Sequence, residues 1–137
     1  MKILRIRVNG LPLYKEPFDV SFCAVQRVQS NHMNSVYNLF GNIYVNTVEA
    51  FAGINASGKT MALKVISFAS MLLGAMPLNA EFIPQILGEN TKVEFDIDFY
   101  VDNKICHLYS RIVKNRNADG SNVVQILSEK LWEKSIT

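Results

Sequence analysis

The sequence lacks a hydrophobic run long enough to cross a membrane. Its longest uncharged apolar stretch spans residues 65–78, whereas a membrane-spanning helix needs roughly 20 apolar residues. Lys2, Arg5 and Arg7 interrupt the first apolar run, so no secretory signal is evident. We therefore expect a cytoplasmic protein with no membrane partner.

The sequence is also poor in cysteine and has no large excess of charge of one sign. Cys23 and Cys106 lie far apart, lack the spacing of metal ligands and fall in strand-like runs, so we expect buried, reduced thiols. The formal net charge of +2 is too small to indicate nucleic-acid binding, which stays open but unsupported. Hydrophobic residues make up 49 % of the 137 residues, which indicates one globular domain over 1–137.

Alternating apolar and polar residues predict β-structure at both ends of the chain. Residues 3–8 and 18–25 alternate around a short polar connection, which predicts an antiparallel hairpin. Residues 92–132 alternate in three runs separated by turn residues, which predicts an antiparallel β meander. The last run is either a strand or a strand that ends in a helix.

The middle of the chain predicts a strand, a loop and a helix in that order. Residues 25–47, rich in Asn, Gln and Ser, are interpreted as a surface loop leading into a strand over residues 43–52. From Lys59 to about Leu73 the pattern is helical and almost entirely apolar, apart from a narrow polar stripe. Such a helix is expected to be buried against a sheet.

Between this strand and this helix lies a stretch that matches the phosphate-binding pattern G-x-x-x-x-G-K-[ST] without a mismatch. It reads Gly53-Ile54-Asn55-Ala56-Ser57-Gly58-Lys59-Thr60. The first glycine permits a sharp turn, and the second lets the backbone approach a phosphate closely. Successive N–H groups and the start of the helix then favour an anion. A chance match in a glycine-containing turn is the alternative interpretation.

Each residue of this motif has an expected role toward ATP and Mg²⁺. Lys59 is expected near the β and γ phosphates, as the catalytic cation, and the Thr60 hydroxyl is expected on Mg²⁺. The expected nucleotide-binding residues are Gly53, Ile54, Asn55, Ala56, Ser57, Gly58, Lys59, Thr60 and Met61. The motif thus predicts binding of a nucleoside triphosphate.

With Asn55 and Ser57 at its variable positions, the motif resembles that of the ATP-binding-cassette class of ATPase heads. The similarity is to structural-maintenance-of-chromosomes and RecF-like ATPases, and above all to prokaryotic AAA-type ATPases of the OLD and abortive-infection kinds. The resemblance implies an α/β P-loop NTPase fold. In it, an N-terminal β-hairpin, a P-loop strand, a buried helix and an antiparallel β meander form the N-terminal lobe of a head. It also implies a role in DNA maintenance or phage defence.

Two motifs that such an ATPase requires are not evident. Neither a Walker B strand nor an LSGG-like signature is evident. The segment most similar to a Walker B strand is residues 98–102, but Asp98 interrupts its apolar run and Asp102 lies in an expected turn. The resemblance therefore implies that a C-terminal half of the head is a missing partner. Homodimers or larger assemblies would form through full-length heads. ATPase activity is undecided, and the chain alone is expected to be poor or inactive.

Several other polar and aromatic residues are candidates for a functional role. Glu94, Asp96 and Asp98 share a strand face that could suggest a metal, although a solvated face is the simpler interpretation. His32 and His107 are interpreted as isolated. Lys114 and Arg116 are interpreted as basic residues of a hairpin tip. Tyr109 and Trp132 are expected to pack on strands or at an interface. The candidates for stacking on adenine are Tyr37, Phe40 and Tyr44.

Three functions stay open on the sequence. The first is the ATP-binding lobe of a cassette-like or OLD-like ATPase, as the resemblance implies. The second is a small, complete P-loop phosphotransferase with an unrecognised acceptor site. The third is a non-catalytic module that senses nucleotide and changes its assembly.

Overall fold

The structure of the chain, a computed structural model, describes residues 1–25, 27–53, 58–79 and 81–136. A five-stranded sheet consists of β1 (Lys2–Asn9), β2 (Phe18–Ser21), β5 (Lys92–Val101), β6 (Lys104–Arg116) and β7 (Asn122–Ser135). A separate two-stranded sheet consists of β3 (Val36–Phe40) and β4 (Ile43–Asn46). The helical segments are η1 (Ser30–Ser35), α1 (Lys59–Leu73) and α2 (Ile83–Ile86).

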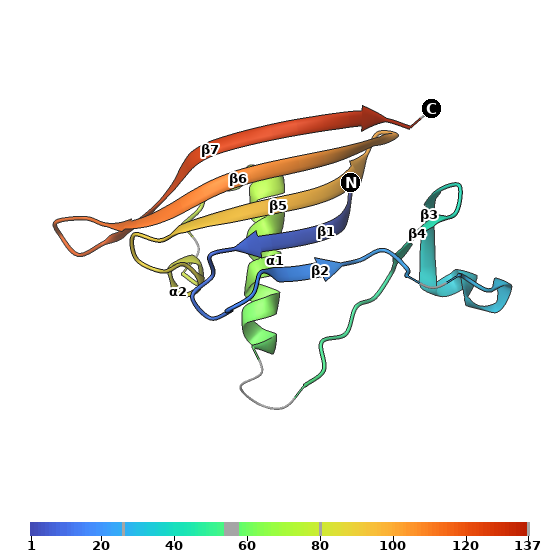
Figure 1. Ribbon diagram of the computed structural model, residues 1–137, viewed down its shortest axis with the longest axis horizontal. Coiled ribbons are helices and arrows are strands. Elements are labelled where there is room, and N and C mark those ends of the chain that lie inside the picture. The colour runs from blue at the N-terminus through green and yellow to red at the C-terminus, as the bar shows by residue number, and fades with distance from the viewer. Residues whose placement is uncertain (26, 54–57, 80, 137) are drawn as a thin grey trace.

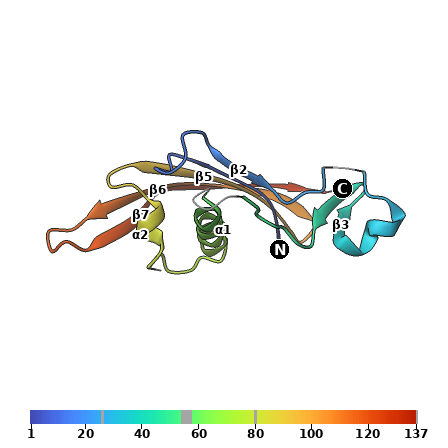
Figure 2. The same ribbon diagram turned by 90° about the horizontal axis from the view of Figure 1, so that it is seen from below.

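The five-stranded sheet is antiparallel throughout, in the order β2-β1-β5-β6-β7. Its strands follow the alternation in the sequence, so Val93, Phe95 and Ile97 of β5 are fully buried on one face. α1 and α2 both lie against that face (Figures 1 and 2). The predicted N-terminal hairpin and the predicted meander are confirmed, and β7 remains a strand to Ser135.

The core of the protein forms between α1 and this face of the sheet. Val65, Phe68 and Ala69 of α1 are completely buried, so the predicted buried helix is confirmed. The ring of Phe68 meets Phe95 edge-on, with ring centroids 5.0 Å apart, an arrangement that aromatic rings favour. Among the described residues, none of the helices combines the length and the apolarity needed to cross a membrane.

The predicted α/β fold of the P-loop NTPase kind is wrong. Such a fold requires a parallel sheet whose strands are buried on both faces, whereas every strand pairing described here is antiparallel. The predicted P-loop strand over residues 43–52 is a strand only at Ile43–Asn46, and it pairs with β3 outside the larger sheet. The chain then leaves the ladder, with the Asn46 side chain bonded to Glu49 at 2.7 Å and Val48 80 % exposed.

The interval 25–47, predicted as a surface loop, contains regular structure. It holds η1 and the β3–β4 hairpin, which turns at Gly41 with a positive φ of 50°. A bridge between Cys23 and Val45 attaches this hairpin to the chain that follows β2. Figure 1 places the hairpin beyond one end of the larger sheet, to the side of α1.

Gly10 ends β1 at a position where a side chain would not fit. Its φ is +87°, and a Cβ there would lie 2.6 Å from the backbone oxygen of Lys92. We expect Gly10→Ala to lower the free energy of unfolding by about 2 to 4 kcal/mol, measured by urea denaturation. Gly120→Ala is the matched control, because Gly120 has a φ of +84° but no atom near its Cβ position. It should lose only about 1 kcal/mol, and equal losses would contradict the steric explanation.

Candidate phosphate-binding site

The candidate site is the junction between the chain after β4 and the first turn of α1. Gly53 and Gly58 to Met61 belong to the described residues, at the end of α1 next to the thin grey trace in Figure 1. Ile54, Asn55, Ala56 and Ser57, which the sequence also assigns to the site, lie outside the described residues. The site is therefore built here from its two flanks.

Gly58 caps the N-terminus of α1 in a left-handed conformation. Its φ is 85° and its ψ is 10°, which glycine adopts without the strain of other residues. The Tyr14 hydroxyl donates a hydrogen bond of 3.2 Å to the Gly58 carbonyl. A Cβ on Gly58 would lie 3.2 Å from that hydroxyl oxygen. The second glycine of the motif is thus required by the backbone here, independently of any ligand.

Lys59 joins the two flanks of the loop. It is the first residue of α1, it is half-buried, and its Nζ donates a hydrogen bond to the carbonyl oxygen of Gly53. This bond places an ammonium group between the start and the end of the motif. A cation in that position can attract a phosphate bound in the same loop.

The first turn of α1 is suited to an anion. It has no side-chain cap and no acidic residue, and the first N–H groups of an α-helix have no partner within the helix. Thr60 is exposed, so its hydroxyl is accessible, whereas Met61 is half-buried and packs against the core. Met61 can therefore contribute its backbone rather than its side chain.

Burial raises the pKa of the Tyr14 phenol, which contacts Gly58. An unfolded chain ionises at the ordinary tyrosine pKa of about 10, so the stability from this partly buried hydroxyl is complete below pH 10. It is lost as the pH rises through the higher folded value. We expect one of the five tyrosines to ionise late in an alkaline absorbance titration, and Tyr14→Phe to remove that late component. An unchanged titration in the variant would contradict this assignment.

The structure does not bring the predicted aromatic residues to the phosphate loop. Tyr37 lies under the Lys2 ammonium, which is 4.9 Å from its ring centroid, and Phe40 stacks on Tyr100 with centroids 6.2 Å apart. Both belong to the β3–β4 hairpin, as does Tyr44. The sequence missed Tyr14, which does contact the loop, because nothing local to residue 14 indicates Gly58 as its partner.

A second polar cluster lies on the face of the sheet opposite α1. His107 is not isolated, contrary to the sequence-based interpretation: its Nδ1 lies 2.7 Å from Asp98 Oδ1 and its Nε2 lies 3.1 Å from Asp96 Oδ1. Only a protonated ring can donate to both carboxylates, because a neutral imidazole has one N–H. The tight turn at residues 102–103 could have revealed this contact, since it sets Asp98 opposite His107.

The neighbours of this cluster form ion pairs rather than a metal site. Glu94 accepts hydrogen bonds from Tyr109 and Arg111. The Arg5 guanidinium beside Asp19 lowers the pKa of that carboxyl. A hollow of about 430 Å³ lies between Arg5, Arg7, Asn9 and the His107 cluster. Among the described residues, no group of histidine, cysteine and acidic side chains is arranged to hold a metal ion.

The remaining sequence candidates lie apart from the phosphate loop in the fold. Asp102 sits in the β5–β6 turn with a positive φ of 48°, and Arg116 is exposed at the end of β6. Lys114 is not at a hairpin tip: it is buried within β6, and its Nζ donates a 3.0 Å hydrogen bond to the Pro84 carbonyl. Trp132 lies beside His107, with ring centroids 5.3 Å apart.

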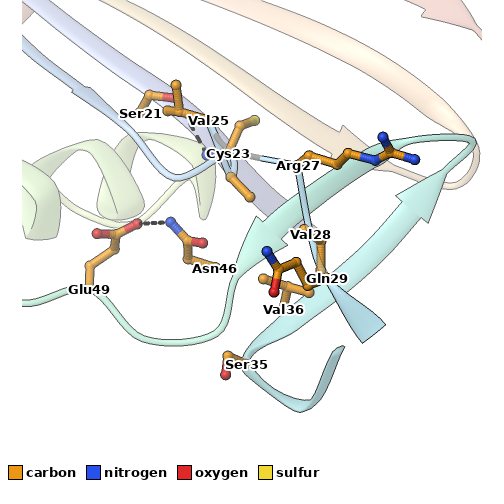
Figure 3. A pocket seen from close by; sticks show the side chains of 11 residues that line it. Ser21, Cys23, Val25, Arg27, Val28, Gln29, Ser35, Val36, Asn46 and Glu49 are labelled. Carbon is orange, nitrogen blue, oxygen red and sulfur yellow. Dashed lines mark hydrogen bonds between the residues drawn. The ribbon is translucent and has the colours of Figure 1, made fainter. Parts of the chain in front are cut away.

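A hollow of about 540 Å³ lies between the chain after β2 and the β3–β4 hairpin (Figure 3). Arg27, Asn46 and Glu49 contribute polar groups to its wall. Burial raises the pKa of the Cys23 thiol that lines it, so this thiol is protonated at neutral pH and a poor nucleophile or metal ligand. Both cysteines are free; Cys106 is buried as predicted, whereas Cys23, also predicted to be buried, is only half-buried.

Comparisons of the chain with protein-family models, with curated proteins and with solved structures gave no match.

Proposed function

We propose that the chain binds the phosphates of a nucleoside triphosphate, with ATP and Mg²⁺ as the ligand pair, through Gly53–Thr60. The observation that carries the proposal is the hydrogen bond between Lys59 Nζ and the Gly53 carbonyl. The bond connects the motif's lysine, which is the first residue of a buried helix, with the motif's first glycine. The proposal depends on this local arrangement and not on a P-loop NTPase fold.

Each described residue has a role in the proposed complex. The Lys59 ammonium exchanges its carbonyl partner for phosphate oxygens, which are stronger acceptors because they are charged. The left-handed Gly58 and the backbone amides of the first turn bind phosphate. The exposed Thr60 hydroxyl is available to Mg²⁺, which otherwise keeps water and phosphate ligands.

The proposed activity is binding, with slow turnover at most by the chain alone. Among the described residues, no carboxylate forms a hydrogen bond with Thr60. Asp102, the nearest Walker B candidate in the sequence, sits in the β5–β6 turn. ATP hydrolysis by the isolated chain at ordinary ATPase rates, on the order of 1 per second or faster, would contradict this part of the proposal.

The proposal is tested by calorimetric titration of the purified chain with Mg·ATP. We expect saturable binding that inorganic tripolyphosphate competes away, because the proposed contacts are to phosphate rather than to base. Adenosine, which lacks phosphate, serves as the matched control ligand and should not compete. Absence of binding, or competition by adenosine alone, would overturn the proposal.

A further inference from the structure

The free edge of β7 is the longest exposed strand edge in the described structure. β7 pairs with β6 from Asn122 to Ser135, and no other described strand pairs with it. Figure 1 shows β7 as the red strand that borders the sheet. Leu127, Leu131 and Trp132 on this strand are 44 %, 60 % and 51 % exposed. An open edge with exposed apolar side chains is a template for pairing with another strand.

The regular part of β7, Ser128–Ser135, separates opposite charges onto opposite faces. The register with β6 sets Glu129 opposite Ser110, on the side that α1 covers, and sets Trp132 opposite His107 on the other side. Because side chains alternate along a strand, the face assignments of the neighbours follow. The helix side carries Glu129, Leu131 and Glu133, and the opposite side carries Lys130, Trp132 and Lys134.

This pattern disfavours a second copy of the chain as the antiparallel partner. A two-fold axis normal to the sheet pairs residues of the same face and is centred on one residue. If the axis passes through a charged residue of the segment, that residue lies opposite the same residue of the second copy. If the axis passes through Leu131, Glu129 of one copy lies opposite Glu133 of the other. If it passes through Trp132, Lys130 of one copy lies opposite Lys134 of the other. Every centre from residue 129 to residue 134 therefore sets like charges opposite each other, which destabilises the pairing.

We propose that the free edge of β7 is a docking site for an extended strand of a different polypeptide. This strand runs antiparallel to Ser128–Ser135, carries basic side chains on the helix side and carries acidic side chains on the other side. Its main chain adds to the sheet, while apolar residues at its centre cover Leu131 and Trp132. The alternating charges then act as the specificity element.

Existing contacts leave the charges of the edge available to such a strand. Glu133 is already bonded to Lys104 at 2.9 Å, and Glu129 accepts a 2.7 Å bond from Ser110. An ionised carboxylate can accept further hydrogen bonds on its remaining lone pairs. Among the described residues, Lys130 and Lys134 are absent from the ion pairs of the protein.

The proposal is tested with two capped peptides of identical composition, read out by the emission of Trp132, the chain's one tryptophan. The complementary peptide is Thr-Glu-Lys-Val-Leu-Glu-Lys-Thr, which sets an opposite charge against each charge of β7 when it binds antiparallel. The exchanged peptide is Thr-Lys-Glu-Val-Leu-Lys-Glu-Thr. We expect the complementary peptide to bind at least about tenfold more tightly, because four cross-strand charge pairs reverse sign between the two peptides.

A matched variant makes the result specific to the edge. Exchanging all four charges, as Glu129→Lys, Lys130→Glu, Glu133→Lys and Lys134→Glu, leaves composition and net charge unchanged and should reverse the preference between the peptides. Binding of neither peptide would overturn the proposal and indicate that the charges only protect the edge. Equal affinities would overturn it as well. A dimer in sedimentation analysis that the complementary peptide dissociates would assign the edge to a second copy instead.

Discussion

Replacing Phe68 by alanine is expected to lower the free energy of unfolding by about 3 to 5 kcal/mol. Phe68 is fully buried in α1 and meets Phe95 of β5 edge-on. The substitution removes the transfer free energy of the ring and leaves a cavity at the contact between α1 and the sheet. Urea denaturation followed by circular dichroism measures the loss.

Leu63→Ala is the matched control for this prediction. Leu63 lies on the same helix but is 54 % exposed, and a surface substitution of this kind usually changes stability by about 0.5 kcal/mol or less. Equal losses in the two variants would contradict the placement of α1, since they would mean that Phe68 and Leu63 are buried alike. A small loss in Phe68→Ala would have the same meaning.

Replacing Lys59 by alanine is expected to weaken Mg·ATP binding on the order of 100-fold. The substitution removes a charged donor from the phosphates, and hydrogen bonds to charged groups contribute about 1.5 to 3 kcal/mol each. Calorimetric titration of the variant against the unchanged chain measures the difference. The overall fold should persist, because Lys59 is only half-buried and α1 is held by its apolar face.

Lys64→Ala is the control that removes the same charge from the same helix. Lys64 is directed to Gln85, with its Nζ donating a 2.6 Å hydrogen bond to that side chain. If the loop binds phosphate, this variant should keep its affinity for Mg·ATP within about twofold, since Lys64 lies outside the loop and its ammonium is bonded to Gln85. Similar losses in both variants would show that net charge, rather than the loop, determines binding.

The sequence predicted those elements whose signal is local. The alternation around Phe95 identified β5 and its buried face, and the apolar run from Lys59 to Leu73 identified α1 with the bounds that the structure has. Each of these patterns reports how one segment divides its side chains between core and solvent. That division was correct even though the fold class implied by the family resemblance was wrong.

The pairing of strands could not be read from the same patterns. Residues 43–52 have the composition of a buried strand, but the segment leaves its ladder after Asn46 and pairs with β3 instead of entering the larger sheet. The parallel arrangement was supplied by resemblance to a family and not by the residues. Contacts between distant segments, such as Tyr14 with Gly58, were likewise invisible before the fold was known.

The expectations drawn from that resemblance stay predictions. They comprise the second half of an ATPase head, assembly through full-length heads, a cytoplasmic location and a role in DNA maintenance or phage defence. The roles proposed for Gly58, Lys59 and Thr60 do not depend on them, because these roles are argued from the backbone and side chains of the residues themselves.

The proposed phosphate-binding loop is tested residue by residue by the amide spectrum of the ¹⁵N-labelled chain during titration with Mg·ATP. We expect the largest shifts on the amides of Gly53–Met61 and hardly any change on the amides of β5–β7. Shifts of the same kind should follow addition of Mg²⁺ with tripolyphosphate. Shifts centred on the His107 cluster or the β3–β4 hairpin, or no shifts at all, would contradict the assignment of Gly53–Thr60 as a phosphate-binding loop.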